Sequence, residues 1–519
     1  MKKKRTGMRW ALWLTLAGAL VLLLQSRPQW VGDRFRPVPE SPFETRECWF
    51  EVNPGDGVTC GFLVSRERPV TGEGLPILIP AAIFKTGAWF PEPDPVVVLG
   101  GGGPGNPVGL SRYSEDDFRE AFGPLALEQG RDLIVIDPRG VGQARPNLEC
   151  PEMLDFLELT LAWPSSDPRT LEAYLLALDQ CRNRLKRESI DLAAYNTENS
   201  ARDLHRLRQA LNYDHWNLVG VSYGAELAFA LLEQDGAAVR SLVLDSPSLP
   251  GTASADFQLA NFHRALLKLW EACSQSAVCD ERFPRLAERF RGLLQRLSAE
   301  PRILRLTHPQ SLEPADVLLD DLVLIDLVFN ALYDPEDIER VPLWLHAADQ
   351  GAYDLVTEVA RRQLAELYQP NSDALAHSVL CQEGLVLKTG FHLKPSLLRE
   401  APWLAPYGRV LDRFAREGCA LWQVPEARPL HLPEGDPLPT LILSGDLDPV
   451  TPPEWGARIQ RALPNSRWWL FAGLSHNLLS DSDCALEQAG RFIADPQAAP
   501  ADPDCPDGGE PLEFVLHPD

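Results

Sequence analysis

Three side chains of the types used in nucleophilic catalysis occur at separate points along this sequence. Ser222 lies in a G-V-S-Y-G segment at residues 220–224, between an apolar run and a helical pattern. Asp448 and His476 each follow a later apolar run. A hydroxyl becomes an effective nucleophile when an imidazole removes its proton, and a carboxylate orients that imidazole. The three residues therefore predict a catalytic triad with Ser222 as the nucleophile and His476 as the base.

The carboxylate of this triad has two candidates in one loop. Residues 445–452 read G-D-L-D-P-V-T-P and follow the apolar run 440–443. We choose Asp448, which directly precedes Pro449, and Asp446 remains the alternative.

A glycine-rich loop is the fourth part of the predicted site. Residues 100–105 read G-G-G-G-P-G and follow the apolar run 96–99. The backbone N–H groups of such a loop, together with the N–H of Tyr223, can stabilise a developing oxyanion. The loop lacks the Lys-Ser/Thr pair of a P-loop and the G-x-G-x-x-G spacing of a dinucleotide site. A phosphate-binding role is therefore disfavoured.

The elements that must position these residues alternate between strands and helices. Continuous apolar runs without alternation are typical of strands buried on both faces of a parallel sheet. Helical patterns lie between them, one with Thr197 as its expected N-cap and one from Ala225 to Glu233. The fold class is therefore α/β, with a mostly parallel central sheet. The predicted strands are 96–99, 132–137, 216–220, 241–245, 440–443 and 468–471.

Residues 251–430 differ from the rest because their apolar spacing is helical. We expect them to form a helical lid, or cap, inserted into the core. The predicted division is a signal or anchor at 1–30, core at 31–250, lid at 251–430, core at 431–500 and a tail at 501–519.

The first residues are typical of a secretory signal. Five cations at residues 2–5 and 9 precede an apolar run at 10–24. The run is shorter than the roughly 20 residues that cross a bilayer comfortably. No convincing small-x-small cleavage site follows it, which leaves an uncleaved N-terminal membrane anchor open. The expected location is periplasmic or secreted.

The ten cysteines support export because an even number suits an oxidising compartment. Taken in chain order they form five short-range pairs, although sequence alone does not decide the connectivity. The pairs would be Cys48–Cys60, Cys150–Cys181, Cys273–Cys279, Cys381–Cys419 and Cys484–Cys505.

Composition limits the partners. The chain has 519 residues, of which 45% are apolar and 24% charged, and a net charge of −24. This composition is that of a globular protein, and its negative charge argues against a nucleic-acid partner. It does not repel the free amine of a peptide. The ten histidines do not cluster and no H-E-x-x-H occurs, so neither a metal nor a cofactor is expected.

The motifs, taken in order, resemble those of exported α/β-hydrolases of the prolyl iminopeptidase and tripeptidyl aminopeptidase group, which are serine peptidases. The similarity spans most of the chain after residue 45, and the order Ser, Asp, His is that of α/β-hydrolases. It departs from the group at Asn106-Pro107 and at Pro138. The segments that carry the resemblance are G-G-P-G at 102–105, D-P-R-G-V-G at 137–142, G-V-S-Y-G at 220–224, G-D-L-D-P-V-T-P at 445–452 and G-L-S-H at 473–476.

This resemblance implies an α/β-hydrolase fold with a helical lid between the two halves of the sheet. The family's triad corresponds to Ser222, Asp448 and His476, and its oxyanion loop to Gly102 and Gly103. The implied activity is the release of amino acids or short peptides from a free peptide N-terminus, through an acyl-enzyme on Ser222.

Such an activity needs a carboxylate that holds the substrate ammonium. Among the lid acids we choose Glu383, because its neighbour Cys381 could fix it through a disulfide. Glu226, one helical turn after Ser222, could equally stabilise the helix dipole. The other lid acids considered are Asp320, Asp321 and Asp326.

Two other functions fit the same residues. A carboxylesterase or lipase-like hydrolase would use the same triad on an ester substrate. A non-catalytic binding protein on a hydrolase scaffold is the third hypothesis.

Overall fold

The computed structural model describes residues 42–252, 255–384, 393–497, 505 and 512–518. The predicted signal or anchor at 1–30 and most of the predicted tail lie outside these residues. Within the described ranges, no helix combines the length and apolar character needed to span a bilayer.

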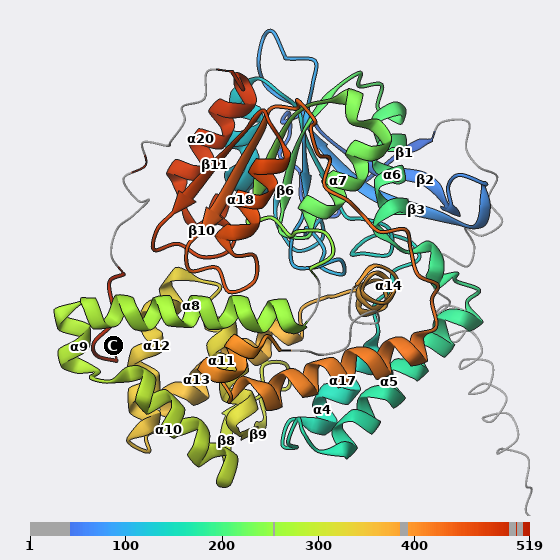
Figure 1. Ribbon diagram of the computed structural model, residues 1–519. Helices are drawn as coiled ribbons and strands as arrows, with labels where there is room; N and C mark the ends of the chain where they lie inside the picture. The colour runs from blue at the N-terminus through green and yellow to red at the C-terminus, as the bar shows by residue number, and fades with distance from the viewer. Residues whose placement is uncertain (1–41, 253–254, 385–392, 498–504, 506–511, 519) are drawn as a thin grey trace, which may run out of the picture. The chain divides into compact units, whose positions relative to one another are not determined.

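The core is a mixed sheet, and in the described residues nine strands form it in the order β1-β2-β3-β5-β4-β6-β7-β10-β11 (Figure 1). From β5 to β11 all neighbours are parallel, whereas β1, β2 and β3 pair antiparallel at one side. The strands are β1 (Phe43–Arg46), β2 (Val58–Arg68), β3 (Glu73–Phe84), β4 (Val96–Leu99), β5 (Leu133–Ile136), β6 (Trp216–Val221), β7 (Val239–Asp245), β10 (Thr440–Gly445) and β11 (Ser466–Phe471).

Strand β4 illustrates why these runs form a doubly covered sheet. All four of its residues are buried, and successive side chains of a strand point to opposite faces. Val97 and Leu99 belong to the hydrophobic core on one face, and Val96 and Val98 to the core on the other. The predicted mostly parallel α/β fold is correct.

Helices cover both faces of this sheet. Those on the face of Val97 are α6 (Thr197–Ala210), α7 (Gly224–Asp235) and α18 (Pro453–Ala462). Those on the opposite face are α3 (Glu115–Phe122), α19 (Leu478–Asp481) and α20 (Asp483–Ala494). The N-cap of α6 is Asn196, whose side chain accepts from the Asn199 N–H. The expected Thr197 cap is therefore wrong by one residue.

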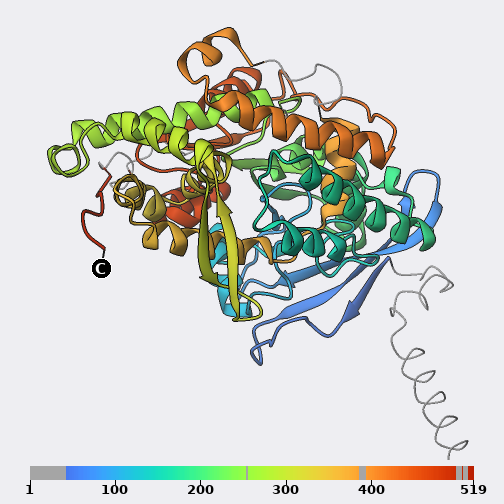
Figure 2. The same ribbon diagram turned by 90° about the horizontal axis from the view of Figure 1, so that it is seen from below.

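Residues 255–422 form a largely helical body beside the carboxyl ends of the strands, here called the lid (Figure 1, Figure 2). Its helices are α8 (Ala255–Gln275), α9 (Ala277–Arg282), α10 (Leu286–Ala299), α11 (Asp321–Ala331), α12 (Pro335–Asp349), α13 (Asp354–Leu367), α14 (Asp373–Glu383), α16 (Pro395–Glu400) and α17 (Leu404–Trp422). It also contains an antiparallel hairpin of β8 (Arg302–Thr307) and β9 (Pro314–Leu319).

Two helices from earlier in the chain pack with the lid. These are α4 (Pro151–Thr160) and α5 (Pro168–Arg187). The rings of Tyr174 in α5 and Phe414 in α17 lie 4.9 Å apart, and the Arg182 guanidinium donates to the Trp422 carbonyl at 3.0 Å. The helices that pack together here therefore come from before and after residue 250 in the chain. The domain boundaries at residues 250 and 430, between the core and the lid, stay a prediction.

The lid is hydrogen-bonded to the loops that carry the predicted acid and base. Arg264 of α8 donates to the carbonyls of Asp446 and Asp448 at 2.6 and 2.5 Å. The Ser475 hydroxyl donates to the Leu332 carbonyl at the end of α11. These bonds brace both loops from the lid side.

Disulfides join all ten cysteines in five pairs, and each cysteine is paired with its neighbour in chain order. The Cys484–Cys505 bond ties the end of the chain to α20. Farther on, the N–H groups of Glu513 and Val515 donate to the side chain and carbonyl of Glu339 in α12, at 2.7 and 3.1 Å. The end of the chain therefore contacts the lid.

Candidate active site

Ser222 occupies a sharp turn between β6 and α7. Its φ is 52°, in the left-handed region that non-glycine residues rarely adopt. The flanking glycines explain how the turn closes. A Cβ on Gly220 would lie 2.8 Å from the Gly224 carbonyl oxygen, and one on Gly224 only 2.2 Å from the Leu99 carbonyl oxygen. The G-V-S-Y-G segment therefore has the strand-turn-helix context of a nucleophile elbow.

Asp448 and His476 are in direct contact. His476 Nδ1 lies 2.8 Å from Asp448 Oδ2. The other oxygen, Oδ1, accepts the N–H groups of Val450 and Thr451 at 2.7 and 2.8 Å. Asp448 is fully buried. Its loop therefore fixes the carboxylate with one oxygen directed at the imidazole.

The charges of this pair support each other. Burial opposes the ionised form of Asp448, but His476 and the Thr451 hydrogen bonds outweigh it and lower the pKa of Asp448. Burial likewise opposes the imidazolium, yet the Asp448, Asp245 and Asp481 carboxylates raise the pKa of His476. An imidazole beside such carboxylates is well suited to accept a proton.

The alternative acid, Asp446, has other partners. Its Oδ1 accepts the Gly473 N–H at 2.9 Å, and its Oδ2 lies 3.2 Å from Lys268 Nζ of the lid. The structure thus brings Asp448, and not Asp446, to His476.

The glycine loop approaches the elbow through a residue that the sequence did not single out. A Cβ on Gly101 would lie 3.1 Å from Ser222 Cβ, so the loop backbone runs directly beside the predicted nucleophile. Gly102 packs against Asn106, where a Cβ would lie 2.0 Å from the side-chain nitrogen. Gly102 and Gly103 both have positive φ, at 79° and 78°. Their role as oxyanion donors stays a prediction.

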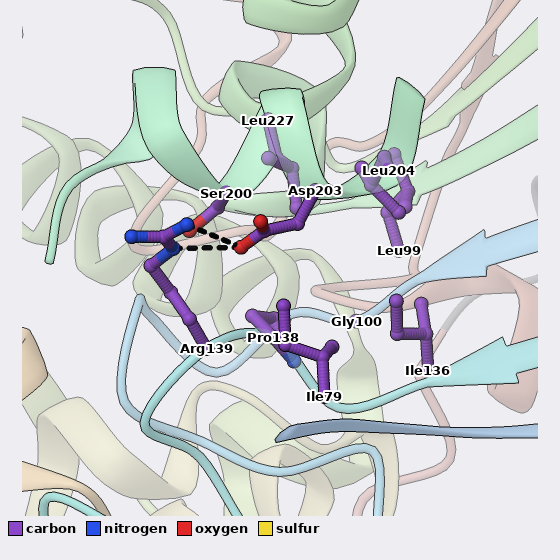
Figure 3. Close-up of a pocket in the computed structure, with 10 residues that line it drawn as sticks. All are labelled: Ile79, Leu99, Gly100, Ile136, Pro138, Arg139, Ser200, Asp203, Leu204 and Leu227. Carbon is purple, nitrogen blue, oxygen red and sulfur yellow. Dashed lines mark hydrogen bonds and ion pairs between the residues drawn. The ribbon is translucent and has the colours of Figure 1, made fainter. Parts of the chain in front are cut away.

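The segment after the glycine loop is held by the D-P-R-G motif. The Val108 N–H donates to Asp137 Oδ1 at 2.8 Å, and burial raises the pKa of Asp137 to about 6. Arg139 forms a buried ion pair with Asp203 at 2.6 Å (Figure 3). The small pocket around this pair is lined by Gly100, Ser200 and apolar side chains, and neither Ser222 nor His476 lines it. The motif therefore holds the segment that follows the glycine loop through Asp137, and Arg139 packs beside Gly100 at the start of the loop.

Two carboxyl groups lie close to the elbow without a cation. Glu383, at the end of α14, accepts the Thr197 N–H at 2.8 Å, and burial raises its pKa. Burial, followed by repulsion from Glu383, raises the pKa of Glu226 to about 8. Within the described residues, neither carboxyl group forms an ion pair. The sequence gives no reason to prefer an ammonium-binding role for Glu226 over a role with the helix dipole.

Tyr223 links this pair to the elbow. Its hydroxyl is hydrogen-bonded to the Thr197 hydroxyl at 2.6 Å, and Thr197 is the residue whose N–H binds Glu383. Burial and the nearby Glu383 raise the pKa of Tyr223 well above its usual value. The phenol is therefore neutral at physiological pH.

The other lid acids considered from sequence have different surroundings. Asp320 caps α11 by accepting the Val323 N–H at 2.8 Å. Asp326 accepts a hydrogen bond from the Tyr407 hydroxyl. Asp321 lies in the first turn of α11, where an acid is favourable to the helix dipole.

Among the described residues, one group has the spacing to hold a metal ion, namely Cys150, Glu152 and Cys181. Its two cysteines are joined in a disulfide and so provide no thiolate ligands.

Comparison with known proteins adds the family context. Residues 95–483 match the family model described as the alpha/beta hydrolase fold. The serine protease Hip1 of Mycobacterium tuberculosis is 26% identical over 518 residues, covering 92% of this chain and 94% of that protein. Carboxylesterase B of the same organism is 27% identical, covering 80% and 78%. The tripeptidyl aminopeptidase of Streptomyces lividans is 24% identical, covering 65% and 63%.

Proposed function

The chain belongs to the alpha/beta hydrolase family and is a hydrolase, and from this premise we propose that it is a serine aminopeptidase. It would release amino acids or short peptides from the free N-terminus of peptides. The observation that carries the proposal is the 2.8 Å contact between Asp448 and His476.

The reaction would follow from these groups. Ser222 Oγ attacks the scissile carbonyl carbon while His476 takes the hydroxyl proton. The resulting oxyanion accepts hydrogen bonds from the N–H of Tyr223 and from the glycine loop at Gly102 and Gly103. His476 then gives its proton to the departing amine, which leaves the acyl group as an ester on Ser222.

Water completes the cycle. His476 removes a proton from a water molecule, whose oxygen attacks the ester carbonyl. Collapse of the second tetrahedral intermediate returns the proton to Ser222 Oγ and releases the carboxylic acid. Asp448 keeps the imidazole in one orientation throughout.

The preference for a free amine rests on Glu383 and Glu226. Two part-buried carboxyl groups that repel each other and lack a cation are suited to an ammonium group, which relieves the repulsion and replaces lost solvation. The tripeptidyl aminopeptidase named among the relatives supports this substrate class.

The experiment is a panel of chromogenic aminoacyl, dipeptidyl and tripeptidyl amides, each with a free and with an acetylated N-terminus. We expect turnover of the free forms, little of the acetylated forms, and none in Ser222→Ala. Rapid turnover of the acetylated substrates alone would contradict the aminopeptidase proposal.

A carboxylesterase is the second candidate, because one relative carries that name. Weak ester hydrolysis alone does not separate the two, since esters have better leaving groups. The ratio of amide to ester turnover for the same acyl group does. A Glu383→Gln variant sharpens the comparison: it should weaken free-amine amides and leave neutral esters unchanged.

We also propose that the protein is exported from the cytoplasm. Five disulfides support an oxidising compartment outside the cytoplasm. A membrane tether through the predicted N-terminal segment remains part of this proposal.

A further inference from the structure

Two consecutive residues at the carboxyl end of β7, Asp245 and Ser246, are bonded to every segment of the predicted triad. Through the backbone, the Asp245 carbonyl accepts the Ser222 N–H at 3.0 Å. The Ser246 N–H donates to the Leu443 carbonyl at 3.0 Å, in the strand that leads into the acid loop. The elbow and β10 are thus joined to one short stretch of chain.

The side chains of the same two residues hold the His476 loop. Asp245 Oδ1 accepts the Leu478 N–H at 3.0 Å and Oδ2 accepts the Leu479 N–H at 2.9 Å. The Ser246 hydroxyl donates to Asp245 Oδ1 at 2.8 Å and accepts the Asn477 N–H at 3.0 Å. The three residues that follow His476 therefore have their N–H groups bound to this pair.

Both side chains are fully buried, so water does not compete for these bonds. A buried carboxylate that accepts two backbone N–H groups and a hydroxyl fixes the geometry of the groups that donate to it. Burial raises the pKa of Asp245, and the bonds from the Leu478 and Leu479 N–H groups, the Ser246 hydroxyl and the charge of His476 favour its ionised form against that rise.

We propose that Asp245 is a positioning residue, which sets the distance between the Ser222 elbow and the His476 imidazole and adds a second negative charge beside that imidazole. This inference rests on the proposed serine hydrolase function. It assigns to Asp245 a role separate from that of Asp448, which contacts the imidazole directly.

The electrostatic part of the inference has a defined set of neighbours. The groups that face His476 are Asp448 from the acid loop, Asp245 from β7, Asp481 from α19 and the neutral Tyr333 from the end of α11. Burial, followed by Asp334 and Asp245, raises the pKa of Asp481 to about 7. The charge of Asp481 therefore changes near pH 7, and the test must control for it.

The test compares Asp245→Asn with Ser246→Ala. The first removes the charge and an acceptor, and the second keeps the charge but removes the acceptor for the Asn477 N–H and the hydroxyl that donates to Asp245. Asp94→Asn is the matched control: Asp94 is also a buried carboxylate, bonded to Arg131 at 2.5 Å and Asn217 at 2.8 Å, but it lies before β4 at the opposite end of the sheet.

We expect both test variants to lose kcat by about 10- to 100-fold with KM little changed, the range for a catalytic group displaced by about 1 Å. Only Asp245→Asn should move the acidic limb of the kcat/KM profile to lower pH, because the loss of a neighbouring negative charge lowers the pKa of His476. The shift should persist in an Asp481→Asn background. Asp94→Asn should change neither quantity.

An unmoved acidic limb in a folded Asp245→Asn variant would overturn the electrostatic part, and an unchanged kcat in Ser246→Ala would overturn the positioning part. If Asp245→Asn does not fold, Ser246→Ala decides the positioning part. Labelling by a fluorophosphonate that survives in Ser222→Ala would refute the proposed function, an outcome distinct from any result with the Asp245 variants.

Discussion

Within the acid loop, two aspartates separated by one residue have different partners. Asp448 contacts His476 with one oxygen and is held by N–H groups with the other, whereas Asp446 pairs with Gly473 and Lys268. The loop conformation therefore assigns one carboxylate to the imidazole and the other to bracing the loop.

Replacement of these two residues gives a matched pair. Asp448→Asn should lower kcat by about 10⁴-fold, because the amide leaves the imidazole in the wrong tautomer. Asp446→Asn should cost less than about tenfold, since its contacts do not reach the imidazole. Steady-state kinetics on a free-amine substrate measures both, and equal losses would contradict the assignment of Asp448.

Glu226 should destabilise the fold as pH rises. Its pKa is about 8 in the folded chain and near 4.5 when unfolded, so between these values folding requires the uptake of a proton. Glu226→Gln should therefore raise the free energy of unfolding at pH 8 by at least about 1 kcal/mol. The gain should shrink toward zero near pH 4.5.

Thermal unfolding at pH 5 and pH 8 measures this difference. Glu198→Gln is the control, because Glu198 is on the surface of α6 and paired with Arg202. An equal gain in the free energy of unfolding at both pH values would show that the charge of Glu226 does not destabilise the fold.

Residues that belong to a recognisable motif could be predicted from the sequence. The residues that surround them in the folded chain could not. Ser222, Asp448 and His476 follow strands in a recognisable order, and the structure brings the last two together. Asp245 and Glu226 carry no motif of their own, because their environment is created by loops more than 150 residues away. Gly101 is likewise indistinguishable from its neighbouring glycines until the elbow lies beside it.

At the scale of elements, the turn between β6 and α7 depends on close backbone approach. Gly224 lies against the end of β4, where a Cβ would be 2.2 Å from a carbonyl oxygen. Gly236, at the other end of α7, has its nearest neighbour at 3.9 Å. Replacement of glycine by alanine should therefore destabilise the chain at the first end of α7 but not at the second.

Gly224→Ala should destabilise the chain by roughly 2 kcal/mol or more, because β4 or α7 must move. Gly236→Ala should be neutral or stabilising by up to about 1 kcal/mol, since its φ of −56° suits alanine. Denaturant unfolding of both variants tests this, and equal stability would contradict the tight approach of α7 to β4.

The strands of the parallel part could be predicted because each is a short, uninterrupted apolar run. The long antiparallel strands β2 and β3 were missed, since Gly61, Pro76 and Pro80 interrupt their apolar pattern. The lid hairpin of β8 and β9 was also missed, because half of its side chains face solvent. The packing of α4 and α5 with α17 depends on contacts that no local pattern records.

At the scale of the whole molecule, the net charge of −24 favours cationic substrates. We expect kcat/KM for a peptide amide with an added lysine to fall several-fold as ionic strength rises from about 0.01 to 0.5 M, as the Debye length contracts. A substrate with the same free amine and a neutral side chain should respond less. Identical salt dependence of the two substrates would contradict long-range attraction.

The lid and the sheet are joined both by hydrogen bonds and by the chain's end. The end of the chain is anchored on α20 by Cys484–Cys505 and then contacts α12 through Glu513 and Val515. Arg282 of α9 adds a bond to the Leu516 carbonyl at 3.3 Å.

This arrangement makes residues 517–518 a convenient point for a reporter group. A fluorophore attached there would follow α9 and α12, whereas a second dye in the hairpin turn between β2 and β3 would stay with the sheet. Energy transfer between the two would read the separation of the two bodies during turnover, without any label near Ser222.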